Sequence, residues 1–271
     1  MEIALFPLLI YYFFLRLVQF TLEKRQKSSN SPWKNGRKRQ ICLGKTARVI
    51  CQNNVTSAIW SPTFATESIK YLMAKFETII PFILHFAAGV APDKLSLPHA
   101  VQFELARSKG WSDDPDDPGG ATMIDVTLST YRAYRKTKGF RSTTKQDLRN
   151  ISFNEWRDIL KNNFWDLWKA DEIESQGIAN ILVDWIWASG PKAIRYAQKI
   201  IGVKADGIVG PLTLSAINNS NQEELFKKIR ISRELHYRQC KGAWKYLNGW
   251  LRRLNAICPD GTFAIRCGSN P

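Results

Sequence analysis

The chain has 271 residues, of which 44% are hydrophobic and 23% charged, a composition that excludes a disordered or collagen-like protein. Lys and Arg number 39 against 24 Asp and Glu, and the formal charge of +15 favours an anionic partner such as nucleic acid, a membrane surface or a cell-wall polymer. Five Cys without a CxxC pair and only three His argue against a structural zinc site.

The first 72 residues differ from the rest of the chain. They hold 11 Lys or Arg against 3 Asp or Glu, and residues 3–20 form an apolar run that is marginal for a membrane span. A secretory signal is disfavoured, because no basic residue precedes the run and no small-residue cleavage site follows it. If the run inserts, the basic stretch after it would hold the rest of the chain in the cytoplasm. The segment is a membrane tether, an upstream extension of the reading frame, or a basic tail for nucleic acid.

Helical periodicity begins near Met73. Apolar residues at helical spacing predict helices over residues 74–88 and 99–109, with a loop over residues 89–98 between them. Residues 110–120 are dense in Gly, Asp and Pro, which excludes a regular helix or a central strand.

The elements that follow are also helical. Residues 128–138 form a helix with a basic face, and Ser152 and Glu155 form a capping box for a helix that carries apolar side chains as far as Trp168. Residues 177–189 are apolar on most sides, which places that helix in a core.

The last part of the chain continues this pattern. Pro191 is expected at the first position of the next helix and Gly202 at its end. Strand patterns are nearly absent, so the fold class is mainly α. Three further helices are expected over residues 212–217, 223–237 and 242–256.

Two motifs carry the functional signal. Residues 110–122 read GWSDDPDDPGGAT, which resembles the signature of glycoside hydrolase family 108, the lysozyme-like N-acetylmuramidases of prophage endolysins. Residues 203–213 read VKADGIVGPLT, which resembles the turn of the helical peptidoglycan-binding module that follows the catalytic domain in that family. Residues 180–190 resemble the family's helix leading into the module.

The resemblance implies a lysozyme-like helical domain over residues 73–170 and a three-helix peptidoglycan-binding domain over residues 171–257, between a leader (1–72) and a tail (258–271). It implies hydrolysis of the β-1,4 bond between N-acetylmuramic acid and N-acetylglucosamine by a monomer, without a metal or cofactor. The partner would be peptidoglycan and not nucleic acid, with a membrane involved only if residues 3–20 insert. The poor leader suits a cytoplasmic protein that reaches the wall through a lesion made by another protein.

Cleavage of this bond needs a carboxylic acid to protonate the leaving oxygen, and a carboxylate or positioned water at the oxocarbenium-like centre. In the family signature a Glu is followed nine residues on by an Asp and five later by a Thr, which here are Asp117 and Thr122. The Glu position holds Ser108 or, on a second alignment, Ala87, so the family's acid is missing. Glu104 lies one helical turn before Ser108 and is the candidate replacement acid.

The alternative is a non-catalytic peptidoglycan-binding protein on the same scaffold. Glu104 would then be a solvated residue or a partner for Arg107, and the acidic turn would serve turn and cap chemistry. Asp125 also departs from the family, which has Gly at this position before a hydrophobic residue and Thr; this departure puts the local backbone conformation in question.

Substrate-binding roles also follow from the resemblance. Trp111 is a stacking platform for a sugar ring or a loop anchor, and adjacent glycines let the backbone approach a sugar closely. In the second motif the Asp-Gly pair also has a structural role in forming a turn, and the Gly-Pro pair has one in starting a helix. The substrate-binding candidates are Trp111, Asp114, Gly119, Gly120, Asp206, Gly207 and Gly210.

Overall fold

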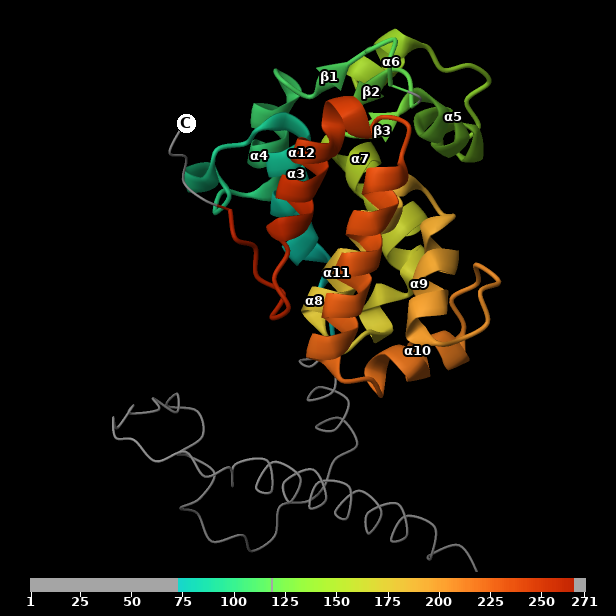
Figure 1. Cartoon of the computed structure of the whole chain (residues 1–271). Coiled ribbons are helices and arrows are strands. Elements are labelled where there is room, and N and C mark those ends of the chain that lie inside the picture. The colour runs from blue at the N-terminus through green and yellow to red at the C-terminus, as the bar shows by residue number, and fades with distance from the viewer. Residues whose placement is uncertain (1–72, 118, 266–271) are drawn as a thin grey trace, which may run out of the picture. The chain divides into compact units, whose positions relative to one another are not determined.

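Helices make up most of the part of the chain described by the computed structural model, residues 73–117 and 119–265 (Figure 1). The expectation of a mainly α fold is confirmed. The α-helices are α3 (Ile79–Ala88), α4 (His99–Arg107), α5 (Leu128–Thr137), α6 (Lys145–Arg149), α7 (Phe153–Leu160), α8 (Gln176–Ser189), α9 (Ala193–Ile201), α10 (Pro211–Asn218), α11 (Gln222–Gln239) and α12 (Ala243–Asn255).

The interpretations of the leader, residues 1–72, lie outside the described residues. Within residues 73–117 and 119–265, no helix has the length and apolar character needed to cross a membrane. These residues fall in one compact unit, and the expected division between residues 170 and 171 stays a prediction.

Local sequence signals account for several helix ends. The side chain of Ser152 accepts a hydrogen bond from the Glu155 amide, and the Glu155 carboxylate accepts one from the Ser152 amide, so the expected capping box is present. Gly202 ends α9 with φ of +86°, as expected. The expectation for Pro191 is wrong, because α9 begins two residues later, at Ala193, after a turn.

The helix that begins at the capping box is shorter than its apolar pattern predicts. α7 ends at Leu160, and a π-helical turn (Lys161–Trp165) and a 3-10 turn (Asp166–Trp168) follow it. In this turn the ring centroid of Phe164 lies 4.7 Å from that of Trp187 on α8. Single π turns occur preferentially at functional sites.

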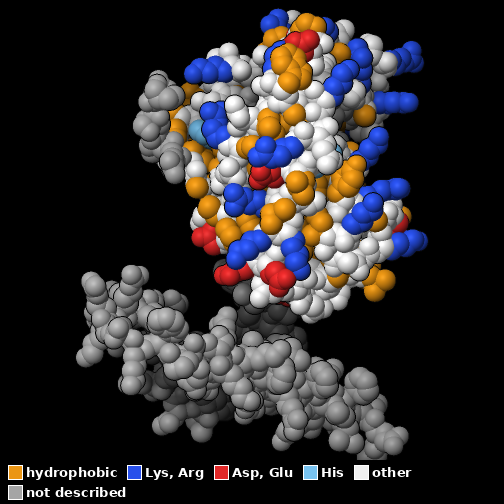
Figure 2. Space-filling view, in the orientation of Figure 1, with side chains coloured by type: hydrophobic (Ala, Val, Ile, Leu, Met, Phe, Trp, Pro, Cys, Tyr) orange, Lys and Arg blue, Asp and Glu red, His pale blue; other side chains and the backbone are white. Residues whose placement is uncertain are grey.

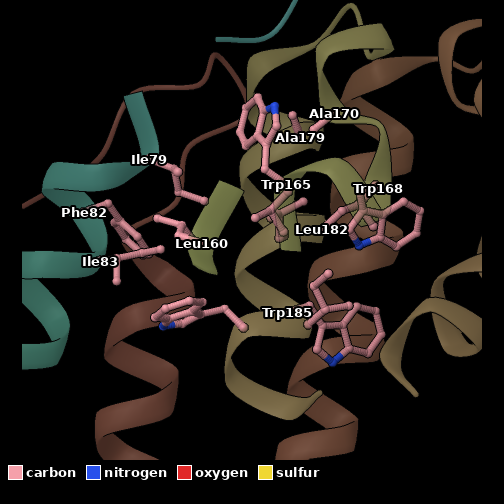
Figure 3. Packing of buried hydrophobic residues seen from close by; sticks show 14 of the residues in the cluster. Ile79, Phe82, Ile83, Leu160, Trp165, Trp168, Ala170, Ala179, Leu182 and Trp185 are labelled. Atoms are coloured by element: carbon pink, nitrogen blue, oxygen red, sulfur yellow. The ribbon is translucent and has the colours of Figure 1, made fainter. Parts of the chain in front are cut away.

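The central helix α8 is buried from Gly177 to Trp187, as its nearly continuous apolar sequence predicts. It packs against α9 and α11, and Figure 3 shows Trp165 and Trp168 on either side of Leu182. On the far side of the same core, the α3 side chains lie beside Leu160 (Figure 3). The core therefore joins the first described helix to the last part of the chain.

A small antiparallel sheet lies at one end of the helices (Figure 1). Its strands are β1 (Trp111–Ser112), β2 (Thr122–Met123) and β3 (Val126–Thr127), paired in the order β1-β2-β3. The acidic turn connects β1 to β2, which agrees with the exclusion of a regular helix there. The strands are too short to show an alternating sequence pattern.

Candidate functional site

The β2–β3 turn packs directly against the end of α4. The amide of Ile124 donates to the carbonyl of Gly110 at 2.7 Å, and the indole of Trp156 donates to the carbonyl of Ile124 at 3.0 Å. A methyl group on Gly110 would lie 2.4 Å from Cγ1 of Ile124, so only Gly fits there. Ser108, one of the two positions at which the resemblance led us to expect a Glu, is the C-cap of α4, two residues before Gly110.

The turn has an unusual backbone. Ile124 and Asp125 have φ of 49° and 61°, the left-handed region that Gly favours. Positive φ at both central residues is the arrangement of a type I′ hairpin turn. A residue with a side chain costs about 1–2 kcal/mol in this region. Asp125 therefore holds a left-handed conformation at the position where the resemblance led us to expect Gly.

The side chain of Asp125 is one-third exposed and is held from two helices. Its Oδ2 accepts from Nε1 of Trp187 on α8 at 3.1 Å and from Nη1 of Arg253 on α12 at 2.7 Å. The exposed fraction is 33%, and among the described residues no hydrogen bond reaches Oδ1. One oxygen is thus fixed and the other is available.

Behind this carboxylate lies a second, fully buried one. Oδ1 of Asp184 accepts from Nε of Arg253 at 2.9 Å, and Oδ2 accepts from Nη2 of Arg233 at 2.5 Å. Burial alone raises the pKa of Asp184, but the guanidiniums of Arg253 and Arg233 outweigh it and hold the pKa below its usual range. Arg233 also donates to the hydroxyl of Tyr237. Arg253 therefore bridges an exposed and a buried carboxylate.

The acidic turn is tied to the same last helix. Oδ2 of Asp114 accepts from Nζ of Lys245 at 2.6 Å and from the hydroxyl of Tyr246 at 2.8 Å, and Lys245 also reaches Asp116 at 3.1 Å. The hydrogen bond from Lys245, then the Asp116 amide and the Tyr246 hydroxyl, lower the pKa of Asp114 to about 2. Asp114 is therefore an ionised partner of α12.

Asp117 differs from its neighbours in the turn. Its Oδ1 accepts from the amide of Gly119 at 2.8 Å, and no cation lies within ion-pair distance of it among the described residues. Asp113, by contrast, is paired with Lys145 at 2.7 Å. Thr122 lies on β2, where it pairs with Ser112 and Thr127, so the sheet brings Thr122 and the acidic turn together.

Glu104 lies on an exposed face of α4. Its side chain is 64% exposed, and its Oε1 lies 3.7 Å from Nη1 of Arg107. A general acid keeps its proton near neutral pH when apolar surroundings desolvate it, and a solvated carboxylate beside a cation has the opposite surroundings. The structure thus shows the interaction with Arg107 that the alternative interpretation expected.

Trp111 and the glycines of the first motif shape the turn. Trp111 is half-buried on β1, and the guanidinium of Arg149 lies over its ring, 4.5 Å from the centroid. One face of the ring is therefore covered. Gly120 has φ of +66°, which explains Gly at this position, while Gly119 supplies the amide that caps Asp117.

The second motif is held by its own hydrogen bonds. Oδ1 of Asp206 accepts from the Ile208 amide at 3.0 Å and from Nε2 of Gln198 at 3.1 Å, and Oε1 of Gln198 accepts from the Gly207 amide. The hydrogen bond from the Ile208 amide and then that from Gln198 lower the pKa of Asp206. Gly210 is the N-cap of α10. These contacts serve the turn, and a role in glycan binding stays a prediction.

Sequence reasoning missed several residues of this region. Asp125 stands out in the sequence only as a departure from the family, and nothing in the local pattern of Trp187 or Arg253 indicates that they contact it. The signals available in the sequence were two polar residues, Asn180 and Asp184, in a nearly apolar helix, and Gln198 among the apolar residues of the next helix. No group of three or more His, Cys, Asp or Glu side chains within residues 73–117 and 119–265 is placed to hold a metal ion.

Comparison with known proteins gives two family matches. Residues 101–190 match the family described as Glycosyl hydrolase 108, and residues 192–255 match the family described as Predicted Peptidoglycan domain. The first match includes Ser108 and not Ala87. Among solved structures, Brucella abortus SagA is similar, with 26% identity and a TM-score of 0.50 over 54% of this chain and 82% of that chain. No curated protein matches the chain.

Proposed function

Since residues 101–190 match glycosyl hydrolase family 108 and residues 192–255 match a peptidoglycan domain, we propose that the chain binds the glycan strands of peptidoglycan and lacks the family's acid-catalysed cleavage. The two families together make it a peptidoglycan hydrolase or peptidoglycan-binding protein. The observation that carries the proposal is the missing acid. Neither Ser108 nor Ala87 has a carboxylate, and Glu104 is solvated beside Arg107.

The charge of the second matched region supports a wall partner. Residues 192–255 hold thirteen Lys or Arg against four Asp or Glu. Figure 2 shows Lys and Arg side chains spread over the face formed by α11 and α12, with few acidic side chains among them. Carboxylates of the peptide stems make peptidoglycan anionic. A basic surface on the protein would therefore raise the local concentration of the protein near the wall.

The second candidate function is N-acetylmuramidase activity, cleavage of the β-1,4 bond between N-acetylmuramic acid and N-acetylglucosamine. One observation favours it. Asp117, at the family's Asp position, has no cationic partner among the described residues, and Thr122 lies nearby on β2 in the family's order. An unpaired carboxylate is able to position a water at the oxocarbenium-like centre.

One experiment separates the two functions. The full chain is incubated with purified sacculi, and the pellet, the turbidity and the soluble products are measured by co-sedimentation, light scattering and mass spectrometry. Binding without soluble products supports the proposal. Products ending in reducing muramic acid support the muramidase, and products lighter by one water would indicate intramolecular transfer instead of hydrolysis.

Variants assign any activity that appears. Glu104→Gln removes the replacement acid, and Asp117→Asn removes the carboxylate that would position water. If the parent cleaves sacculi and the folded Glu104→Gln variant does not, Glu104 is the acid. The proposal that the chain binds peptidoglycan without cleaving it is then wrong. Double-stranded DNA is included as a competitor, and its displacement of sacculi would contradict peptidoglycan as the partner.

A further inference from the structure

We propose that Asp125 is the carboxylate that contacts the glycan at this site, and that Arg253 and Trp187 are its positioning residues. The proposal rests on the proposed function, peptidoglycan binding. The ligand group would be a neutral donor of an amino sugar, either a hydroxyl or the N–H of an N-acetyl group.

The first argument is the position of Asp125. The Ile124 amide donates to the carbonyl of Gly110, two residues after the C-cap of α4, so Asp125 lies next to a residue bonded to the segment that leaves this helix. Ser108, one of the two positions at which the family's acid is missing, is the C-cap of that helix. On this proposal, the adjoining hairpin turn offers a carboxylate in the region where the helix end lacks one.

The second argument is the state of the two oxygens. Oδ2 of Asp125 accepts from both Trp187 and Arg253, which fixes the carboxylate plane and balances its charge. Oδ1 receives no hydrogen bond from any described residue, and the side chain keeps a third of its surface. An anchored carboxylate with one free oxygen accepts a hydrogen bond from a sugar donor with little further loss of conformational entropy.

The third argument is the backbone. Asp125 has φ of 61° in a turn where the family has Gly. A side chain in this region is unfavourable, and such strain is concentrated at functional positions where the surroundings hold the residue in place. Here the indole of Trp187 and the guanidinium of Arg253 hold it. Asn or Asp tolerates the left-handed region better than most residues, which fits a polar group kept in the turn.

The fourth argument is the origin of the anchor. Arg253 lies in the peptidoglycan-domain match, whereas Asp125 and Trp187 lie in the glycosyl hydrolase match. Arg253 is itself fixed by Asp184, whose side chain has no exposed surface. Helix α12 therefore completes the site, and the two matched regions form one binding surface here.

The test measures binding of peptide-free glycan strands to the full chain by isothermal titration calorimetry. In Asp125→Asn the donors on Trp187 and Arg253 require the amide oxygen at the Oδ2 position, which leaves an NH2 group where the ligand needs an acceptor. Affinity is expected to fall about tenfold, the usual effect of losing a hydrogen bond to a charged group. Asp125→Gly introduces the residue that the family has at this position, and Gly adopts a positive φ without strain. This variant should weaken binding as much as Asp125→Asn does.

Two further variants test the positioning role. Arg253→Gln removes the cation that orients Asp125 and should weaken binding, whereas Arg253→Lys keeps a charge and should restore part of the affinity. The matched control is Asp158→Asn. Asp158 lies on α7, and its carboxylate accepts a hydrogen bond from Tyr134 and lies near Lys138. It should bind as the parent does, and thermal unfolding of each variant checks the fold.

The outcomes separate this inference from the proposed function. If the parent binds strands and both Asp125 variants bind equally well while folded, Asp125 does not contact the glycan and the proposed function stands. If the parent binds neither strands nor sacculi, the proposed function and this inference are both wrong. Loss of affinity in the Asp158 control as well would mean that the effect is general to carboxylates, which also contradicts the inference.

Discussion

Asp184 on α8 and Arg233 on α11 form an ion pair in which neither side chain has exposed surface, with Oδ2 and Nη2 2.5 Å apart. Asp184 lies in the glycosyl hydrolase match and Arg233 in the peptidoglycan-domain match. Arg233 also donates to the carbonyl of Ile181 at 3.0 Å, so the same side chain satisfies a backbone acceptor of α8. The two matched regions are thus joined through the protein core, in addition to the partly exposed pairs of Asp114 with Lys245 and of Asp125 with Arg253.

Removing one member of this pair should be strongly destabilising. Arg233→Met leaves the Asp184 carboxylate buried with only Arg253 as a cation, and breaking a buried pair on one side typically costs about 3–5 kcal/mol. Urea denaturation should show this loss in the free energy of unfolding. The control is Glu224→Gln, which breaks an exposed pair with Lys228 on the same helix and should leave the midpoint unchanged. Equal effects of the two variants would contradict a structural role for the buried pair.

The part of the described chain that ends with the first matched region should not fold by itself. A fragment of residues 73–190 lacks Arg233 and Arg253, so Asp184 would lose both of its cations, and α8 would lose its packing against α9 and α11. Circular dichroism and denaturant titration of the fragment are expected to show no cooperative transition. A fragment that unfolds cooperatively, with the stability of the full chain, would show that the two regions are independent.

The packing of the hairpin against α4 gives a matched pair of glycine substitutions. In Gly110→Ala the new methyl group would lie 2.4 Å from Ile124, and overpacking of this kind costs about 1–3 kcal/mol. Gly249 lies inside α12 with nothing within 4 Å of a built methyl group, so Gly249→Ala should stabilise the protein by about 0.5–1 kcal/mol. Thermal unfolding of both variants should shift the midpoint in opposite directions. Midpoints that shift together would contradict the close approach at Gly110.

Helices and their ends followed from sequence where a local rule decides them. The capping box at Ser152, the left-handed Gly202 and the buried α8 each depend on residues within a few positions of one another. The interruption after Leu160 did not follow, because the apolar pattern continues through the π turn and only tertiary packing of Phe164 against Trp187 distinguishes it. The prediction that Pro191 occupies the first position of α9 was wrong, because a turn lies between Pro191 and the start of the helix at Ala193.

The candidate site was less predictable for a physical reason. The motif identified the acidic turn, but the partners of that turn, Lys245 and Tyr246, are more than a hundred residues away. The same holds for Arg253, whose spacing from Asp125 in sequence says nothing about their contact. Local patterns predict turns and helices, whereas contacts between distant residues depend on how the helices pack.

The tyrosines of α5 give a prediction for alkaline pH. Burial, together with a hydrogen bond to Glu155, raises the pKa of Tyr131 to about 12, and burial, with the charge of Asp158, raises that of Tyr134 to about 12. A folded-state pKa above the unfolded value of about 10 means that the folded protein favours the protonated phenol. The stabilising contribution is complete below about pH 10 and is lost as the pH rises toward 12. Thermal midpoints measured across this range should fall.

The double variant Tyr131→Phe with Tyr134→Phe tests the cause of that decline. It keeps both rings in the core but removes the two phenols, so the midpoint should be lower near neutral pH, where the hydrogen bonds to Glu155 and Asp158 are lost, and should fall less steeply above about pH 10. Burial also raises the pKa of Tyr237, so the alkaline slope should be reduced and not abolished. Ultraviolet difference spectra of the parent should show that these phenols ionise at a higher pH than free tyrosine does. An unchanged slope in the double variant would assign the alkaline loss of stability to other groups.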